Sequence, residues 1–413
     1  MSSSTNLKVP KGWREITLGN LGKFSTSSVD KKVSSSETPV RLVNYMDVYR
    51  NDFINDSLEL MEVTATRYEI ERSQVKMGNL LFTPSSETPD DICHCSVVTE
   101  ELSNTLHSYH TVRLELSTDS EIDIRFSGRL GYIASVAAHL QRRATGSTRY
   151  TLTLGDFEET RLVLPPIQEQ RIIGKILDDL DDAMNASHDA INKLKDMKLG
   201  LIQDLITPNL EGNGLRNSLQ YFQDEVQILP LREVAELLDS RRIPINSDER
   251  FNRQGEIPYY GANGQQGWID TPIFSEPLIL LAEDGGNFDD FSTRPIAYRI
   301  DGPAWVNNHA HVVRARDGYC QDFLFWSLVH KDIRKYIAGG TRSKLTQGEM
   351  LDITINVPSY SRQQKIAEIL NNLEERLEDE NNNFNNLSLI KKGLMDDLLS
   401  GKVRIPESME VCA

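Results

Sequence analysis

Two short basic turns carry the side chains in this chain that are best suited to hold phosphate groups. Residues 125–150 contain five arginines and no Asp or Glu, and the window closes on Ala-Thr-Gly-Ser-Thr-Arg, ending at Arg149. Residues 329–344 contain five Lys or Arg against one acid, and they include Gly-Gly-Thr-Arg-Ser-Lys, ending at Lys344. Backbone N–H groups, hydroxyls and guanidinium groups together favour contact with nucleic-acid phosphates, and arginine can also read guanine. For either turn alone, a solvated charged face is the simpler interpretation.

Other polar clusters favour structural roles. Cys93-His94-Cys95, with His107 and His110, lacks a common zinc spacing, so we expect a strand with two cysteines on one face. The cluster 307–311 is interpreted as a hydrogen-bonding surface. The sequence contains no P-loop and no Asp/Asn-Pro-Pro-aromatic motif of amino-methyltransferases. It also lacks, in a strand context, an acidic pair followed by Asp/Glu-x-Lys, as many nucleases have. We therefore predict no metal site and no catalytic residues.

The two basic turns belong to an internal repeat. When the sequence is shifted by 193 residues, residues 146–206 align with 339–399 without a gap, and 19 of the 61 pairs are identical. One unit is therefore present twice. Because the turns fall at equivalent positions, nucleic-acid contact is the better interpretation for both. A second equivalence, at an offset of 201, pairs His110–Arg113 with His311–Arg314 and the strand-end loop 80–87 with 281–288.

Each copy ends in a long helix. Apolar residues recur alternately three and four positions apart, which is typical of a coiled-coil seam. Helices of about 40 residues are roughly 60 Å long, more than a small domain can cover, so we predict that the two pair antiparallel. Separately packed amphipathic helices are the alternative. The acids at 178–179, 181–182 and 374 are expected to face solvent. The predicted seam consists of Ile173, Leu177, Leu180, Leu194, Leu201, Leu205, Ile366, Leu370, Leu373, Leu387, Leu394 and Leu398.

The remaining sequence mixes short alternating apolar runs with Gly, Pro, Asn and Ser turns. The expected fold class is α+β: two globular domains separated by two long antiparallel coiled-coil helices, with a pseudo-two-fold duplication. The predicted boundaries are 1–164 for the first globular domain, 165–207 for the first long helix, 208–226 for a linker, 227–357 for the second globular domain, 358–401 for the second long helix and 402–413 for a tail.

Composition limits the possible functions. The chain has 413 residues and a net charge of −16, which excludes a globally basic nucleic-acid coat and requires local patches instead. No apolar run approaches the roughly 18 residues of a membrane helix. The N-terminus lacks the apolar core of a signal peptide. Four cysteines are too few for a disulfide framework. We expect a reduced, cytoplasmic protein that is not in the membrane.

The duplicated arrangement and several motifs resemble the specificity (S) subunit of type I restriction–modification systems. Trp13–Gly22 is similar to the family's opening, and Leu164-Pro-Pro-Ile-Gln-Glu-Gln170 is similar to the start of its conserved helical region. Thr83–Thr88 resembles one class of target recognition domain. Ile257–Asn263, Leu281–Gly285 and Trp305–His311 resemble another class. The second helix departs from the pattern, because Ser361-Arg-Gln-Gln364 lacks the glutamate.

The resemblance implies a DNA-binding subunit without chemistry of its own. Each globule would be a target recognition domain that reads one half of a split, asymmetric site in double-stranded DNA. The coiled coil would set the spacer and dock two methyltransferase (M) subunits, which bind S-adenosylmethionine, and restriction/translocase (R) subunits would complete the complex. This chain itself would need no cofactor.

A self-contained DNA methyltransferase or nuclease, and a scaffold that binds no DNA, are the alternatives. The residues expected to contact DNA are Ser85, Ser86, Glu87, His110, Arg113, Arg142, Arg143, Thr148, Arg149, Asn263, Glu283, Asp284, Asn307, Asn308, His309, His311, Arg342, Ser343 and Lys344.

Overall fold

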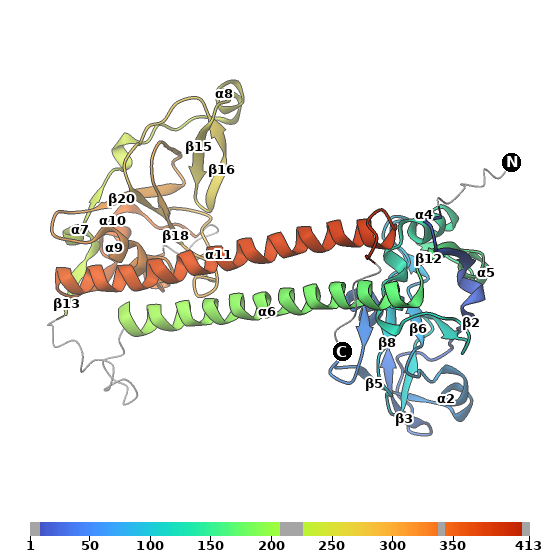
Figure 1. Cartoon of the computed structure of the whole chain (residues 1–413). Coiled ribbons are helices and arrows are strands. Elements are labelled where there is room, and N and C mark those ends of the chain that lie inside the picture. Colours follow the sequence, from blue (N-terminus) through green and yellow to red (C-terminus); the bar gives the residue numbers. More distant parts are fainter. Residues whose placement is uncertain (1–8, 207–225, 338–342, 407–413) are drawn as a thin grey trace. The chain divides into compact units, whose positions relative to one another are not determined.

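The computed structural model describes residues 9–206, 226–337 and 343–406. Its contacts divide the chain into two units. Unit 1 consists of Met1–His188 with Asn383–Ala413, and unit 2 is Asp189–Asn382. The units divide both long helices, α6 (Ile167–Ile206) and α11 (Tyr360–Leu399), which are green and orange-red in Figure 1. Arg342, most of the predicted linker and the end of the predicted tail lie outside the described residues.

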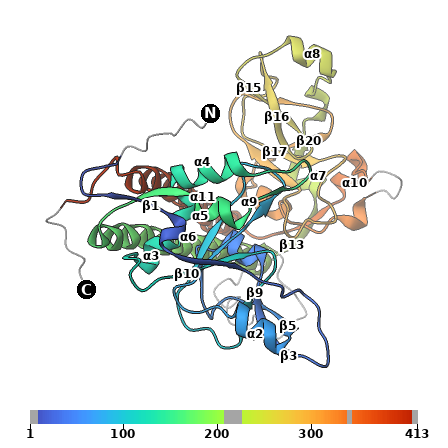
Figure 2. The same ribbon diagram turned by 90° about the vertical axis from the view of Figure 1, so that its right-hand side faces the viewer.

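Unit 1 is built on a five-stranded sheet in the order β2-β10-β6-β8-β4, beside a three-stranded sheet in the order β5-β3-β9. In Figure 2, α2 lies beside the three-stranded sheet. Two further strand pairs, β1-β12 and β7-β11, join distant segments. The strands are β1 (Arg14–Thr17), β2 (Gly22–Thr26), β3 (Thr38–Val43), β4 (Phe53–Ile54), β5 (Met61–Ala65), β6 (Leu80–Phe82), β7 (Ser85–Ser86), β8 (Cys95–Val98), β9 (Thr105–His107), β10 (Val112–Leu116), β11 (Tyr150–Thr151) and β12 (Arg161–Leu164). The short helices are α1 (Tyr45–Arg50), α2 (Arg67–Ser73), α3 (Ile124–Ser127), α4 (Ala134–Arg143) and α5 (Leu154–Glu158).

Unit 2 is built on a four-stranded sheet in the order β14-β20-β17-β18, with a three-stranded sheet in the order β16-β15-β19 and the pair β13-β21. Its strands are β13 (Gln227–Pro230), β14 (Ala235–Leu237), β15 (Ile257–Gly261), β16 (Gly264–Ile269), β17 (Leu278–Ala282), β18 (Ala297–Ile300), β19 (Trp305–Val306), β20 (Ala310–Ala315) and β21 (Thr354–Val357). Its short helices are α7 (Leu231–Val234), α8 (Ser247–Asn252), α9 (Gln321–Leu328), α10 (Gln347–Leu351) and the 3₁₀ turn η4 (Asp239–Arg241).

The central strands of the two units correspond at an offset of 199. In unit 1, Leu114 of β10 pairs with β2 and with Leu80 of β6. In unit 2, Val313 of β20 pairs with β14 and with Ile279 of β17 in the same way. The predicted offset of 201 is therefore wrong by two residues, a shift that keeps the alternation of a strand intact. Val112, rather than His110, occupies the position of His311.

Each unit by itself holds the long helices antiparallel. In unit 1, Ile173 and Leu177 near the start of α6 share a core with Leu398 and Leu399 at the end of α11. In unit 2, the end of α6 and the start of α11 lie in one core with the sheet and α9. The predicted antiparallel coil is thus the observed arrangement, and the ends of the helices also complete the cores of the globules.

The predicted seam residues are all at least partly covered. Seven of the twelve are buried, and Leu180, Leu201, Leu205, Leu387 and Leu394 are half-buried. Residues that the pattern omitted, Ile202, Ile206 and Leu399, are also buried because they enter the globule cores.

The acids predicted to face solvent include two that bind across the coil. In unit 1, Lys391 Nζ lies 2.5 Å from Asp181 Oδ1, and in unit 2, Lys198 Nζ lies 2.8 Å from Glu374 Oε2. The repeat of 193 residues converts one pair into the other. The two lysines occupy interruptions in the apolar pattern of the seam, and lysine is amphipathic enough to bury its stem while its amine reaches a carboxylate. The prediction that Asp181 and Glu374 face solvent is therefore wrong, because both lie at the edge of the seam.

Both long helices begin with the same glutamine contact. Gln170 Nε2 donates to the Pro165 carbonyl at 2.9 Å, and its Oε1 accepts from the Asp123 N–H at 2.9 Å. Gln363 donates to the Pro358 carbonyl at 2.9 Å and accepts from the Cys320 N–H at 2.9 Å. Each amide thereby joins its helix start to a neighbouring short helix of the globule, and both its donor and its acceptor are used.

Next to Gln170, a buried glutamate binds the C-terminal segment. Glu169 accepts from Arg404 through both carboxylate oxygens at 2.9 Å and from the Trp13 indole at 2.9 Å. Arg404 also donates to the Lys11 carbonyl at 2.7 Å. Before this contact the chain turns at Gly401, whose φ of +68° favours glycine and where a Cβ would meet the Pro10 ring at 2.6 Å. Segments from both ends of the sequence therefore meet at the start of α6.

Candidate nucleic-acid interface

The basic turn of unit 1 is joined to a strand end by backbone hydrogen bonds. Tyr150 and Thr151 of β11 pair with Ser86 and Ser85 of β7, and the Leu152 N–H donates to the Pro84 carbonyl at 2.9 Å. This ladder places the turn 145–149 beside the polar loop that follows β6. Ser85 and Ser86 are buried by this pairing, whereas Glu87 is exposed. The structure thus brings together two segments that were predicted separately.

Exposed basic side chains lie in this turn and in the helix before it. Thr148 and Arg149 are exposed, as are Arg142 and Arg143 in the last turn of α4. Arg149 Nε donates to Ser85 Oγ at 3.3 Å, whereas Arg143 pairs with Glu159 at 2.9 Å. Burial, followed by the positive charges of Arg149 and Lys31, lowers the pKa of His110. Arg149 and Lys31 therefore lie close enough to His110 to disfavour its protonated form.

Three arginines of the predicted basic window and strand have structural roles instead. Arg129 is fully buried and binds Asp178 at 2.7 Å and Asp181 at 2.8 Å. Arg125 binds Asp178 at 3.1 Å. Arg113 is also buried, and its guanidinium donates to the backbone carbonyls of Arg72, at 3.1 Å, and of Gln74. The predicted DNA contact by Arg113 is therefore wrong, because its guanidinium is buried and both of its Nη atoms donate inside the domain.

Sequence reasoning missed an aromatic cluster close to the same surface. The rings of Tyr45 and Tyr49 stack on α1 with centroids 5.9 Å apart, and the His94 ring lies 4.2 Å from Tyr49. Asp91 accepts from the Tyr49 hydroxyl at 3.2 Å and contacts His94 Nε2 at 3.0 Å. Burial and Asp91 raise the pKa of Tyr45, while Arg149 opposes the shift. Two tyrosines four positions apart in a short helix were the available signal.

In unit 2 the segment 343–345 is joined to its strand end by an equivalent backbone hydrogen bond. The Leu345 N–H donates to the Glu283 carbonyl at 2.8 Å, and Asp284 and Lys344 form an isolated β-bridge. Ser343 and Lys344 are exposed. Leu152 and Leu345 are equivalent in the repeat, and so are Pro84 and Glu283 at the offset of the strands. The same backbone hydrogen bond therefore positions a basic segment in both units.

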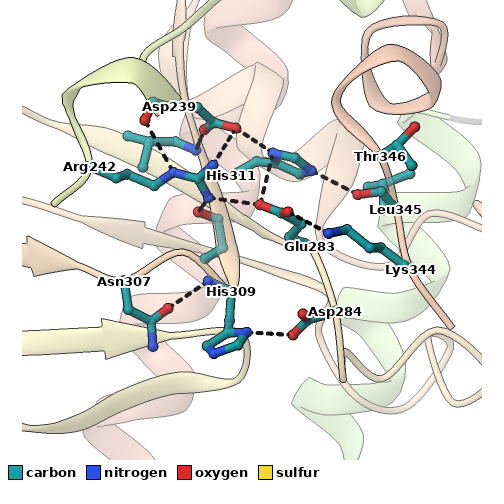
Figure 3. Close-up of polar contacts among 12 residues, drawn as sticks. Asp239, Arg242, Glu283, Asp284, Asn307, His309, His311, Lys344, Leu345 and Thr346 are labelled. Carbon is teal, nitrogen blue, oxygen red and sulfur yellow. Dashed lines mark hydrogen bonds and ion pairs between the residues drawn. The ribbon is translucent and has the colours of Figure 1, made fainter. Parts of the chain in front are cut away.

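Of the other predicted contact residues of unit 2, Asn307 and His309 lie near Asp284 (Figure 3). His309 Nδ1 lies 2.7 Å from Asp284 Oδ1, and the His309 N–H donates to Asn307 Oδ1 at 2.8 Å. Asn263 Nδ2 donates to the Gly285 carbonyl at 2.8 Å. Asn308 and Asn263 are exposed, His309 and Asp284 are half-buried, and Asn307 is buried. The motif stretches thus converge on one region, but Asn307 serves to hold the loop.

His311 and Glu283 belong to a charge network below that surface. The side chain of His311 is only 2% exposed, and the side chains of Asp239, Arg242 and Glu283 are 10–14% exposed. The ligand atoms of Asp239, Glu283 and His311 lie within 4.8 Å of one another, which a metal ion could use. Arg242 and Lys344 already neutralise both carboxylates, at 2.8–3.2 Å. We therefore assign the group a structural role, and His311 is too buried to be the predicted DNA contact.

The cysteine segment also differs from the prediction. Cys95 lies in β8, but Cys93 precedes the strand with a φ of +72°, so the two do not form one face of a strand. Both are free and buried, and burial raises the pKa of each thiol. His107 is buried against Thr111 at 3.1 Å, away from a cysteine ligand set. These residues therefore pack the domain.

The chain thus has a duplicated architecture, in which each of two α+β globules holds a basic segment at a strand end and packs on two antiparallel helices. The model of the family "Type I restriction modification DNA specificity domain" matches residues 106–196 and 223–387, more than half of the chain. The chain belongs to this family, and the sequence resemblance is confirmed.

Curated relatives and a solved structure agree with this assignment. A putative type I restriction enzyme specificity subunit of Haemophilus influenzae is 35% identical over 36% of this chain and 37% of its own length. The type I restriction enzyme MjaVIII specificity subunit of Methanocaldococcus jannaschii is 23% identical over 97% of this chain and 95% of its own. The crystal structure of an S subunit from M. genitalium shares the fold, with a TM-score of 0.61 at 16% identity over 99% of both chains. Among the described residues, no helix is both long and apolar enough to span a membrane.

Proposed function

We propose that this chain is the DNA-recognition subunit of a type I restriction–modification complex, with each globule reading one half of a split, asymmetric site. One observation carries the proposal: the same backbone hydrogen bond, from Leu152 to Pro84 and from Leu345 to Glu283, fixes a basic segment in each of two repeated units. An arginine or lysine held on a rigid strand end can contact phosphates and base edges in register. Two non-identical surfaces read two different half-sites.

The long helices supply the second part of the proposal. They set the spacer between the half-sites and dock two M subunits, whose S-adenosylmethionine supplies the methyl group, while R subunits supply translocation and cleavage. Exposed apolar side chains support docking on the helices: Met197 of α6 is 45% exposed, and Leu389 and Ile390 of α11 are 70% and 50% exposed. Contiguous exposed apolar residues mark protein–protein contacts, and Leu389 and Ile390 are consecutive on α11. The chain itself performs no chemistry in this scheme.

The test uses one variant in each globule. The methylated motif of the host genome gives the wild-type half-sites, and Arg149→Ala and Lys344→Ala are then assayed in the complex with M subunits on duplexes altered in one half-site. The loss of a base contact costs about 1–3 kcal/mol of binding free energy and relaxes the base preference in one half-site only. Arg149→Ala should relax the half-site read by unit 1, and Lys344→Ala the half-site read by unit 2.

Matched controls are Arg161→Ala in unit 1 and Arg294→Ala in unit 2. Both arginines are exposed and form surface ion pairs, at 3.5 Å with Glu15 and at 3.7 Å with Asp290. These two variants should discriminate in both half-sites as well as the wild-type chain does. A uniform loss for all sequences with a shallower salt dependence would reassign the contact to phosphate. Unchanged binding by both test variants would remove the basic segments from the interface.

A further inference from the structure

In unit 2, a buried side-chain network joins four segments that are distant in sequence (Figure 3). Asp239 and Arg242 come from η4 and the residue after it, Glu283 follows β17, and His311 lies in β20. The fourth segment is 343–345, which contains exposed Lys344. The network therefore lies directly behind the residue that we assign to the reading of the second half-site.

His311 connects two of these segments through its ring. Nδ1 lies 2.6 Å from Asp239 Oδ2, and Nε2 lies 3.0 Å from the Leu345 carbonyl oxygen. A carbonyl oxygen only accepts, so Nε2 donates to Leu345, while Nδ1 faces the carboxylate of Asp239. The other oxygen of Asp239 accepts from the Val312 N–H at 2.8 Å. The ring is thereby fixed at both ends.

Glu283 connects the remaining segments. Its Oε2 accepts from Arg242 Nη1 at 2.8 Å, and its Oε1 lies 3.2 Å from Lys344 Nζ. Arg242 also binds Asp239 at 3.0 Å and donates to the Ala310 carbonyl at 2.7 Å. Glu283 is thus bound by Arg242 on one side, and on the other side it binds the amine of Lys344, which is half-exposed. Charge-assisted hydrogen bonds of this kind are directional and strong.

Unit 1 has no such charges at the equivalent positions. Val112 stands where unit 2 has His311, and Pro84 stands where it has Glu283. Unit 1 instead joins its turn through the two-residue ladder between β11 and β7, whereas the described part of unit 2 has one bridge between Asp284 and Lys344. The side-chain network of unit 2 therefore takes the place of a missing backbone pair.

We propose that His311, acting with Asp239 and Glu283, is a positioning residue that fixes the segment 343–345 and the amine of Lys344 for reading the second half-site. The inference rests on the proposed function and adds to it a buried residue that touches no DNA. Because the described residues of unit 1 have no such charges at the positions of His311 and Glu283, the loss of the network affects one half-site. Contact geometry must hold to within about 0.5 Å for a bidentate or point contact to discriminate bases.

The experiment measures binding of the complex with M subunits to three duplexes: the methylated site, a site altered in the first half and a site altered in the second half. For His311→Gln, discrimination in the second half should fall about tenfold, which is the loss of one base contact, and discrimination in the first half should be unchanged. Asp239→Asn should act in the same direction, because it keeps the acceptor for Val312 N–H but loses the charge. Arg314→Ala is the control, since Arg314 is exposed on the same strand and pairs with Glu236 at 2.6 Å.

A double mutant separates positioning from general stability. If His311 acts through Lys344, adding His311→Gln to Lys344→Ala should leave discrimination as it is in Lys344→Ala alone. Full additivity, or equal loss at both half-sites, would overturn the proposal. The proposal would also be overturned if the wild-type complex discriminates in both halves and the variants His311→Gln and Asp239→Asn discriminate equally well. That result would leave the proposed function intact. A wild-type complex without sequence preference would instead refute the proposed function.

Discussion

Glu169 shows how one residue can make the stability of the C-terminal segment depend on pH. Burial raises the pKa of this carboxyl, but hydrogen bonds from Arg404, Trp13 and the Ile405 N–H outweigh burial, and the net pKa is lowered. A lowered pKa in the folded state stabilises the contact above the ordinary glutamate pKa of about 4.3, and this stabilisation is lost as the pH falls below it. Hydrogen exchange of residues 401–406, corrected for intrinsic rates, should show protection at pH 6 that declines below about pH 4.

The matched variants are Glu169→Gln and Glu158→Gln. The first removes the charge that Arg404 binds, so protection of 401–406 should be low at both pH values. Glu158 is exposed in the same unit, and its variant should keep the wild-type pH dependence. Strong protection in Glu169→Gln at pH 6 would mean that packing, rather than the ion pair, holds the segment.

For single residues, the sequence indicated which residue types could contact DNA, but it did not indicate which of them are exposed in the fold. Arg149 and Lys344 are exposed in the turns, as expected. Arg129 and Arg113 are of the same residue type or charge, yet both are buried. Carboxylates about 50 residues away bind Arg129, and backbone carbonyls about 40 residues away bind Arg113. A local window contains no information about such partners, because they depend on the tertiary fold.

At the scale of elements, the seam contains both apolar and ionic positions, and they should respond differently to substitution. Leu373 is 6% exposed, so Leu373→Asp buries an unpaired carboxylate and should lower the free energy of unfolding by about 2–4 kcal/mol. Glu374→Gln removes only the partly exposed partner of Lys198 and should cost about 0.5–1 kcal/mol. Urea unfolding of the full chain measures both.

Glu375→Gln provides the background, because Glu375 is exposed on the same helix. It should change the urea midpoint by less than either test variant. Equal destabilisation by Leu373→Asp and Glu374→Gln would contradict the division of the seam into apolar and ionic positions.

The long helices were the most predictable elements. Their three–four spacing, the preceding prolines and the repeat were sufficient to predict both helices and their antiparallel pairing. The spacing also explains what was missed: a search for apolar residues treats Lys198 and Lys391 as interruptions, although they bind acids across the seam. The globules were less predictable, since short strands with non-local partners such as β7 and β11 leave little periodic signal.

At the scale of the whole molecule, the proposed spacer function predicts how inserted residues act. Each long helix has one end in the core of each unit, through Ile173 and Ile202 in α6 and through Leu398 and Ile366 in α11. Seven residues inserted in both helices, after His188 and after Asn382, preserve the heptad and add about 10 Å between these anchored ends. At roughly 3.4 Å per base pair, the spacer in the methylated motif should lengthen by about three base pairs.

Methylome sequencing of a strain with the inserted variant checks this prediction, and both half-site sequences should stay the same. The control is an insertion of seven residues between Thr207 and Pro208, which lies beyond Ile206, the last anchored residue of α6. It should leave the spacer unchanged. A longer spacer in the control, or an unchanged spacer in the active double insertion, would show that helix length does not set the distance.

Unit 1 combines residues 1–188 with residues 383–413, and this affects the order in which the protein folds at the ribosome. Its globule is synthesised first, but the core that contains Ile173 and Leu177 also requires Leu398 and Leu399, and Glu169 requires Arg404. At about 5–20 residues per second, the first globule waits at least ten seconds for the final helix to emerge. During that interval its apolar helix face is uncovered, so nascent chains that stall in the second half should be recognised by chaperones and proteases through the first half.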